Sequence, residues 1–260
     1  MTIILRPSRA LFRFSGTDAQ KLLFDVVTGR LLAEGGPPVW WALLSPQGKI
    51  QAEGLSSYDD GAFWLDVDNG VADAFFKRMR MYRLRAAVEI ADLRQSHAVG
   101  WGGGAPHTRV IGSEAEARDW EAPDDRYAAA RIAQGIAEEG PDFAADTTFP
   151  HDIGMDFLGG VDFKKGCYIG QEVVSRMEHR GTARRRPVIV SGIDAPAGSA
   201  VVANGRDAGT VGQVVGGKAV GILRLDRIED PDVATVGGKP VTLTLPDWAT
   251  YKFGESVAAD

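Results

Sequence analysis

The chain has 260 residues, of which 44% are hydrophobic and 25% charged, and this composition is ordinary for a globular protein of one large or two smaller domains. The formal net charge of −6 argues against nucleic-acid binding by the whole surface, and no apolar run approaches the roughly 20 residues of a membrane span. The N-terminus does not resemble a signal peptide, and a single cysteine fits a reducing compartment. We therefore expect a cytoplasmic protein.

The first elements predicted are a strand and a helix. Residues 10–14 (ALFRF) alternate as in a strand, and residues 15–29 (SGTDAQKLLFDVVTG) follow with a helical period. Thr17 and Gln20 have the spacing of a capping box, and Gly29 is a candidate for the end of the helix. The apolar positions on one helical face are Ala19, Leu22, Leu23, Val26 and Val27.

Three apolar runs over residues 39–68 are separated by the turn sequences SPQG and DDG, which predicts a β-meander. Residues 70–85 restore a helical period, and residues 86–93 read as a strand. The glycine-rich stretch 100–108 lacks the lysine and hydroxyl of a phosphate-binding loop, so we interpret it as an ordinary turn.

A third helix pattern covers residues 122–135, with an acidic first turn and Gly135 at its end. After residue 182 the texture changes to short valine-rich segments broken by Gly, Pro, Asn and Asp, which is typical of a small β-barrel or sandwich. A domain boundary is therefore expected near residue 182.

The chain's single cysteine, Cys167, lies in a locally basic segment. Between Asp162 and Arg186 there are seven Lys or Arg residues and three acids. Cations and a following helix N-terminus both favour the reactive thiolate, and Lys164 and Lys165 would supply the charge. The alternatives are a buried, inert cysteine and a basic run that is only a solvated face.

The sequence gives little sign of a metal site. The four histidines are scattered, and none has a zinc-like spacing to the cysteine. One cysteine cannot by itself hold an iron–sulfur cluster, which typically takes four ligands. We therefore predict no metal site within this chain alone.

Residues 164–176 (KKGCYIGQEVVSR) resemble the K-G-C-Y-x-G-Q-E signature of the YgfZ-type folate-binding family, which is related to the aminomethyltransferase (T-protein) of the glycine cleavage system. Stretches in the order expected for the family also occur near the start, at 43–55 (LLSPQGKIQAEGL) and at 131–143 (RIAQGIAEEGPDF). Residues 184–228 are similar to its C-terminal domain. Family members are implicated in the maturation of iron–sulfur proteins, a tRNA-modifying enzyme among them.

The resemblance implies an α+β fold, with antiparallel-sheet folate-binding modules in a ring-like, T-protein-like arrangement and a C-terminal β-barrel. The domains would be residues 1–181, with a possible second subdomain at 51–122, then the barrel at 182–250 and a tail at 251–260. The cofactor would be tetrahydrofolate, whose carboxylates suit a basic patch. Cys167 would be the functional thiol, and the residues expected to bind folate or anions are Lys164, Lys165, Gly166, Tyr168, Gly170, Gln171, Glu172, Arg176 and Arg131.

One departure from the T-protein pattern concerns the carboxylate that holds the pterin in those relatives, because its position is Ala133 here. This favours an accessory protein in iron–sulfur cluster assembly or repair, with client or assembly proteins as partners, over a classical enzyme. The alternatives are a folate-dependent one-carbon transferase and a tRNA-binding factor using residues 180–186 (RGTARRR). The acidic net charge and the lack of interleaved aromatic residues argue against direct nucleic-acid binding.

Overall fold

The fold was analysed in a computed structural model, which describes residues 2–254. The last six residues of the tail predicted at 251–260 lie outside this range. The chain forms two compact units, Met1–Tyr127 with Gly159–Gln171, and Ala128–Leu158 with Glu172–Asp260. The division into domains at 1–181 and 182–250 stays a prediction. Among the described residues, no helix has the length and apolar character needed to span a membrane.

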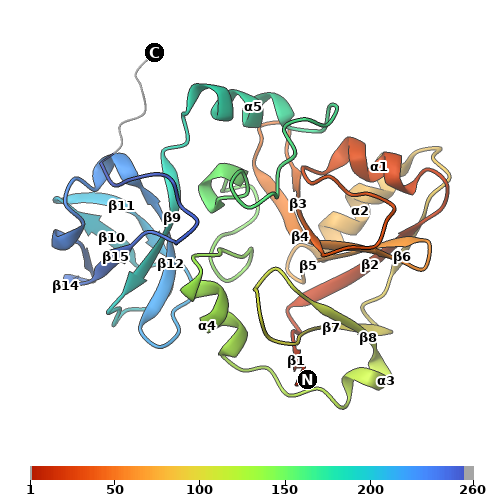
Figure 1. Cartoon of the computed structure of the whole chain (residues 1–260), viewed down its shortest axis with the longest axis horizontal. Coiled ribbons are helices and arrows are strands. Elements are labelled where there is room, and N and C mark those ends of the chain that lie inside the picture. Colours follow the sequence, from red (N-terminus) through yellow and green to blue (C-terminus); the bar gives the residue numbers. More distant parts are fainter. Residues whose placement is uncertain (1, 255–260) are drawn as a thin grey trace. The chain divides into compact units, whose positions relative to one another are not determined.

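The first unit is built on a five-stranded antiparallel sheet with the order β3-β4-β5-β2-β6. The predicted meander over residues 39–68 is confirmed, since its three strands pair in sequence. Two helices, α1 (Ala19–Val26) and α2 (Ala72–Arg83), cover one face of the sheet (Figure 1) and share its apolar core. The strands are β2 (Arg9–Ser15), β3 (Val39–Leu44), β4 (Ile50–Asp59), β5 (Ala62–Asp68) and β6 (Glu89–Asp92).

Helix α1 begins differently from the prediction. Its N-cap residue is Asp18, and no side chain caps the helix, so the capping box of Thr17 and Gln20 is wrong. The Asp18 carboxylate instead accepts a hydrogen bond of 2.7 Å from the backbone N–H of Ala87, because this side chain is drawn into a tertiary contact. The apolar face is as predicted, and the helix ends at Val26, three residues before Gly29.

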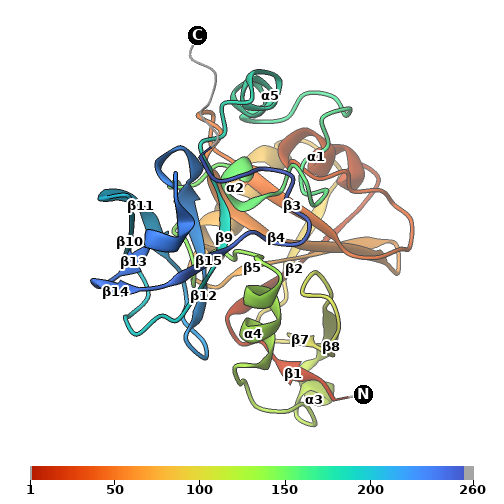
Figure 2. The ribbon, with the colours of Figure 1, turned by 60° about the vertical axis from the view of Figure 1, so that its left-hand side comes forward.

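A smaller three-stranded sheet, β1-β7-β8, completes the first unit together with helix α3 (Glu114–Ala117) (Figure 2). Its strands are β1 (Ile4–Leu5), β7 (His97–Trp101) and β8 (Val110–Ser113). The glycine-rich stretch 100–108 ends β7 and forms the connection to β8, with Gly103 and Gly104 at positive φ. The interpretation of this stretch as a turn is confirmed.

The second unit contains a nearly closed, seven-stranded antiparallel barrel with the order β14-β13-β10-β11-β12-β9-β15. The expected all-β region after residue 182 is therefore confirmed, and its core is rich in valine and alanine. Its strands are β9 (Arg185–Ser191), β10 (Ala200–Ala203), β11 (Arg206–Val211), β12 (Lys218–Arg224), β13 (Thr235–Val236), β14 (Lys239–Pro240) and β15 (Thr242–Thr244). The helices in this part of the chain are α4 (Arg126–Ala133), α5 (Gln171–Arg180) and the short 3₁₀ turns η1 (Pro150–Ile153), η2 (Leu225–Arg227) and η3 (Pro231–Val233).

Candidate functional site

Cys167 is exposed on the loop that leads into helix α5. The alternative of a buried, inert cysteine is therefore wrong. The thiol lies four residues ahead of the first residue of α5, as the helical pattern after it predicted. An exposed sulfur on an ordered loop is accessible to a partner, whereas a sulfur in the core would only fill space.

Lys165 is the residue that fixes this loop to the first unit. Its ammonium group donates hydrogen bonds to three backbone carbonyls at and just beyond the end of α1: Phe24 at 2.8 Å, Val27, and Gly29 at 3.2 Å. The ammonium also lies 4.9 Å from the ring centroids of Phe24 and Tyr168. A helix C-terminus carries unpaired carbonyls and partial negative charge, so a buried cation fits there.

Burial lowers the pKa of Lys165 to about 8, against the opposing charges of two nearby aspartates. An ammonium group has three protons to donate. Lys165 was predicted to bind an anion, but its ammonium group donates to three backbone carbonyls within the protein. Lys165 holds the loop in place, and Lys164, whose side chain is exposed, is the cation that faces solvent.

Two further contacts hold the segment on either side of the thiol. Asp162 accepts hydrogen bonds from the backbone N–H groups of Lys164 and Lys165, at 2.8 and 3.2 Å. Gly170 has φ +79°, and a Cβ there would lie 2.6 Å from the carbonyl oxygen of Ser45, in the turn between β3 and β4. Both the positive φ and the close approach require glycine at this position. These contacts keep Cys167 on a rigid support.

Tyr168 has a buried side chain, and its hydroxyl has no hydrogen-bond partner among the described residues. Burial raises the pKa of Tyr168, and the charge of Asp162 raises it further, so the hydroxyl remains protonated. A buried hydroxyl without a partner is costly, so this O–H is a group that a bound ligand or a water could satisfy.

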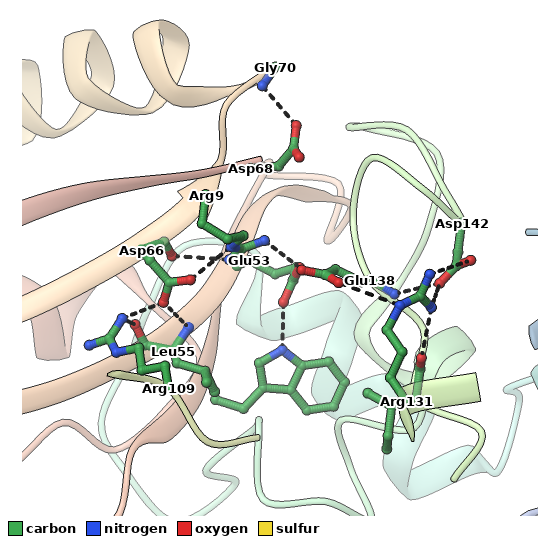
Figure 3. A network of polar contacts seen from close by, with 12 residues as sticks. Arg9, Glu53, Leu55, Asp66, Asp68, Gly70, Arg109, Arg131, Glu138 and Asp142 are labelled. Atoms are coloured by element: carbon green, nitrogen blue, oxygen red, sulfur yellow. Dashed lines mark hydrogen bonds and ion pairs between the residues drawn. The ribbon is translucent and has the colours of Figure 1, made fainter. Parts of the chain in front are cut away.

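The face of the five-stranded sheet opposite α1 and α2 carries buried charges, which the sequence analysis did not single out (Figure 3). Arg9 on β2 donates from Nε to Asp66 on β5 at 2.7 Å and lies 3.5 Å from the carboxylate of Glu53 on β4. The second Glu53 oxygen accepts a hydrogen bond of 2.6 Å from the indole N–H of Trp40. Figure 3 shows Arg9, Glu53 and Asp66 pointing toward one another.

Arg109, from the segment before β8, completes the network by pairing with Asp66 and by donating to backbone carbonyls of β4 and β5. Burial would raise the pKa of Asp66, but the charges of Arg9, Arg109 and Arg6 outweigh it and bring the pKa to about 2. The approach of the strands depends on Gly54, because a Cβ there would lie 1.8 Å from the backbone oxygen of Asp66.

In the second unit, Arg131 has a fully buried side chain that makes several polar contacts (Figure 3). It pairs with Asp142, donates to the side chain of Gln213 at 2.8 Å and to the carbonyl of Ile136 at 3.2 Å, and lies 3.5 Å from Glu138. Arg131 was predicted to bind folate or another anion. Its protein partners make it a structural cation that joins α4 to the loop before β12.

The other predicted residues lie on or beside α5. Gln171 is its first residue, and Glu172 and Arg176 form an exposed i,i+4 ion pair of 2.7 Å. Such a pair contributes roughly 0.3–0.5 kcal/mol to a helix, so both side chains remain available to other partners. Gly166 lies close to α1, since a Cβ there would be 3.2 Å from the ring of Phe24.

A histidine and two acids come together in the second unit, which sequence spacing did not indicate. The potential ligand atoms of His151, Asp156 and Glu178 lie within 4.8 Å of one another. Arg186 occupies the same position, with Nη1 at 2.9 and 2.8 Å from the two Asp156 oxygens. Burial and the charge of Arg186 lower the pKa of His151 to about 4, so the imidazole is neutral at pH 7. The Arg186 guanidinium already supplies a cation to Asp156, and Glu178 lies 3.2 Å from Nε2 of His151.

Comparisons with known proteins support the predicted fold and the C-terminal β-barrel. Residues 183–251 match the family described as the CAF17 C-terminal β-barrel domain. The solved structure of the glycine cleavage system aminomethyltransferase T from Bartonella henselae has a TM-score of 0.77 to this chain, covering 97% of this chain and 87% of its own. With 15% sequence identity, this similarity shows the fold. The predicted fold class, antiparallel sheets with a C-terminal barrel, is confirmed.

The chain is also similar to proteins named as iron–sulfur cluster assembly factor IBA57. The mouse protein is 29% identical over 92% of this chain and 83% of its own length. The homologues of Pyricularia oryzae and Mycosarcoma maydis are 28% and 29% identical, and the chain spans only 54% and 56% of their length. The chain is therefore similar to iron–sulfur cluster assembly factors over most of its length and to the CAF17 family in its C-terminal barrel.

The relatives overturn one prediction. The IBA57 proteins of the mouse and of both fungi are mitochondrial by name. The expected cytoplasmic location, which was based on the N-terminus and on cysteine usage, is therefore wrong. A reducing compartment and a lone cysteine do not distinguish the cytoplasm from other reducing compartments.

Proposed function

We propose that this chain is a tetrahydrofolate-binding accessory protein that assists the assembly or repair of iron–sulfur clusters in client enzymes, with Cys167 as its functional thiol. The observation that carries the proposal is the exposure of Cys167 on a loop held rigidly from both sides. Two motif residues support this loop. Lys165 donates hydrogen bonds to buried carbonyls, and any side chain larger than hydrogen at Gly170 would collide with the carbonyl oxygen of Ser45.

The cluster is the cargo in this proposal, and Cys167 supplies one thiolate ligand to it. A cluster iron is tetrahedral and takes sulfur ligands, so one cysteine leaves the remaining protein ligands to a partner. The exposed side chain of Lys164 lies three residues before Cys167 on the same loop. The chain would thus engage a cluster only while a client or assembly protein holds it.

The folate part of the proposal depends on the motif residues of the first unit. The unpartnered hydroxyl of Tyr168 is a polar group suited to fixing one edge of a bound pterin. The exposed ammonium of Lys164 suits a carboxylate of the glutamate tail. Lys165 and Arg131 would support folate binding only by stabilising the fold, because their charged groups already have partners within the protein. Folate would supply one-carbon or redox chemistry when bound.

The thiol is tested by complementation of a strain that lacks the corresponding gene. Cys167→Ser is expected to leave the fold intact and to lose most of the client iron–sulfur enzyme activity. A matched control, Cys167→Ser with Gln95→Cys, restores one exposed thiol on a turn away from the motif. Full activity of the serine variant, or equal rescue by the displaced thiol, would contradict a specific role for Cys167.

Folate binding is tested separately, by equilibrium titration of the full chain with tetrahydrofolate. Tyr168→Phe is expected to weaken binding about tenfold through the loss of one buried hydrogen bond. Tyr58→Phe is the control, because it removes the same hydroxyl from a half-buried tyrosine at the end of β4. No saturable binding by the wild type would remove folate from the proposal and leave the thiol role standing.

A further inference from the structure

A cavity in the second unit is lined by three arginines. It has a volume of about 360 Å³ and lies between the strands β9, β11 and β12 and the loop of residues 142–148. Arg185, Arg224 and Arg227 line it, and the two carboxylates in its lining are Asp142 and Asp207. This volume is within the range of small-molecule sites.

The two carboxylates are engaged by the protein. Asp142 is paired with buried Arg131 and also accepts hydrogen bonds from the backbone N–H groups of Glu138 and Gln213, at 2.8 and 3.0 Å. One oxygen of Asp207 accepts a hydrogen bond of 2.9 Å from the backbone of Gly209. Neither of these two carboxylates therefore forms an ion pair or a hydrogen bond with Arg185, Arg224 or Arg227 in the described structure.

The arginines differ in how much of their hydrogen-bonding capacity is used. Arg224 is held by Asp226 through Nε and Nη2, at 3.1 and 2.6 Å. Arg227 donates from Nη1 to the backbone oxygen of Asp207 at 2.6 Å, which leaves its other donors available. The Arg185 guanidinium makes no hydrogen bond or ion pair within the described part of the chain. A guanidinium has five donors in a fork that matches a phosphate group.

The register of strands β9 and β12 places two positive charges side by side, which destabilises the barrel. Arg185 and Arg224 are directly opposite each other on β9 and β12. Side chains in such cross-strand positions have Cβ atoms about 5 Å apart, and like charges there are destabilising. Asp226 balances only one of the pair. An anion in the cavity would balance the other, and this is the physical reason to expect one.

We infer that this cavity binds a nucleotide-sized phosphomonoester, with the phosphate between Arg185 and Arg227. A phosphate dianion matches two guanidinium groups that have no carboxylate of their own, and charge-assisted hydrogen bonds of this kind are the strong ones. The hydroxyls of Thr148 and Thr210 line the same cavity, and Phe143 and Ile222 provide an apolar wall for the organic part of the ligand. None of the residues that line this cavity is in the motif around Cys167.

The test is a calorimetric titration of the full chain with AMP and, separately, with inorganic pyrophosphate. Both are expected to bind with dissociation constants below about 1 mM. Arg185→Gln and Arg227→Gln should each weaken binding about tenfold, because each removes one charge-assisted contact. Arg185→Lys, which keeps the charge and loses the fork, should fall between the wild type and Arg185→Gln.

Lys218→Gln is the matched control. It removes one exposed positive charge at the other end of β12, about 20 Å along the strand from Arg224. Binding by this variant should equal that of the wild type, and the Tm of the wild type, but not of Arg185→Gln, should rise with AMP. The free Arg185→Gln variant should unfold no more easily than the wild type, so loss of binding cannot be attributed to misfolding.

Three results would overturn the inference. The first is no binding of either probe by the wild type, and the second is an equal loss of affinity in Lys218→Gln, which would indicate general charge attraction. The third is binding of pyrophosphate without AMP, or of a short RNA without either probe, since the ligand would then be another kind of anion.

Discussion

The basic run between Asp162 and Arg186 contains two clusters of cations, Lys164–Lys165 and Arg184–Arg186, and the structure treats them alike. In the first, Lys165 is buried on three carbonyls while Lys164 is exposed. In the second, Arg186 is paired with Asp156 and lies over the Phe157 ring, while Arg185 has no partner in the described structure.

The difference within each cluster shows that adjacent cations in one charge run can have opposite roles. In each cluster, the cation that has partners within the protein (Lys165 or Arg186) stabilises the fold, and an exposed cation beside it (Lys164 or Arg185) is available to a ligand. Sequence charge alone does not separate them, because both members contribute equally to the local net charge. Measurements of stability separate the committed from the exposed members directly.

The largest expected effect is that of Lys165→Met. The variant leaves three carbonyls at the end of α1 without their donor in a buried position, so we expect a loss of about 4 kcal/mol in the free energy of unfolding. Urea denaturation followed by circular dichroism measures this. A loss below about 1 kcal/mol would mean that water replaces the ammonium and that Lys165 does not anchor the loop.

Arg186→Gln should have the next largest effect. It leaves the buried carboxylate of Asp156 without its cation and removes a hydrogen bond of 2.8 Å to the carbonyl of His151. Breaking one partner of a buried pair costs about 3 kcal/mol. The double variant Arg186→Met/Asp156→Leu should recover part of this loss, and no recovery would contradict the pairing as its cause.

The buried carboxylate of Asp66 is a negative charge that has partners within the protein, as Lys165 and Arg186 are positive charges that do. Its pKa is lowered from 3.8 to about 2 in the folded state, so the folded state favours the ionised form. Its contribution of about 2 kcal/mol is present above pH 4 and is lost as the pH falls toward 2. Unfolding measured between pH 5 and pH 2 should therefore show a steeper loss in the wild type than in Asp66→Asn, and parallel curves would contradict this.

The smallest effects are expected from the exposed members, Lys164→Gln and Arg185→Gln. Neither side chain has an ion-pair partner within the described residues, so each change should alter the unfolding free energy by less than about 0.5 kcal/mol. Urea curves that overlap the wild type would confirm the division within the clusters. A loss comparable to that of Lys165→Met would show that exposure does not distinguish the two roles.

The parts of the fold that depend on local period and turn chemistry could be predicted. The apolar face of α1, the meander over residues 39–68 and the all-β region after residue 182 are all present. Features that depend on a partner distant in sequence could not. The predicted capping box of Thr17 and Gln20 is absent, and the carboxylate of the N-cap residue Asp18 instead accepts a hydrogen bond from the backbone N–H of Ala87, which is 69 residues further along the chain.

The candidate site divides in the same way. The motif around Cys167 was recognisable because its residues are contiguous. The buried network of Arg9, Glu53 and Asp66 was not, because it joins one residue from each of three strands. A signal was present in the strand of residues 62–68 (AFWLDVD), where an acid interrupts an apolar run at a position facing away from the helices.

The sequence by itself determined the order of elements, the position of the thiol and the local excess of positive charge. The tertiary structure decided which charged side chains have partners within the protein, because those hydrogen-bond partners are set by the packing of distant segments. Lys165 and Lys164 are neighbours with identical side chains, and only the position of three carbonyls of α1 and the residues after it makes one structural and leaves the other exposed.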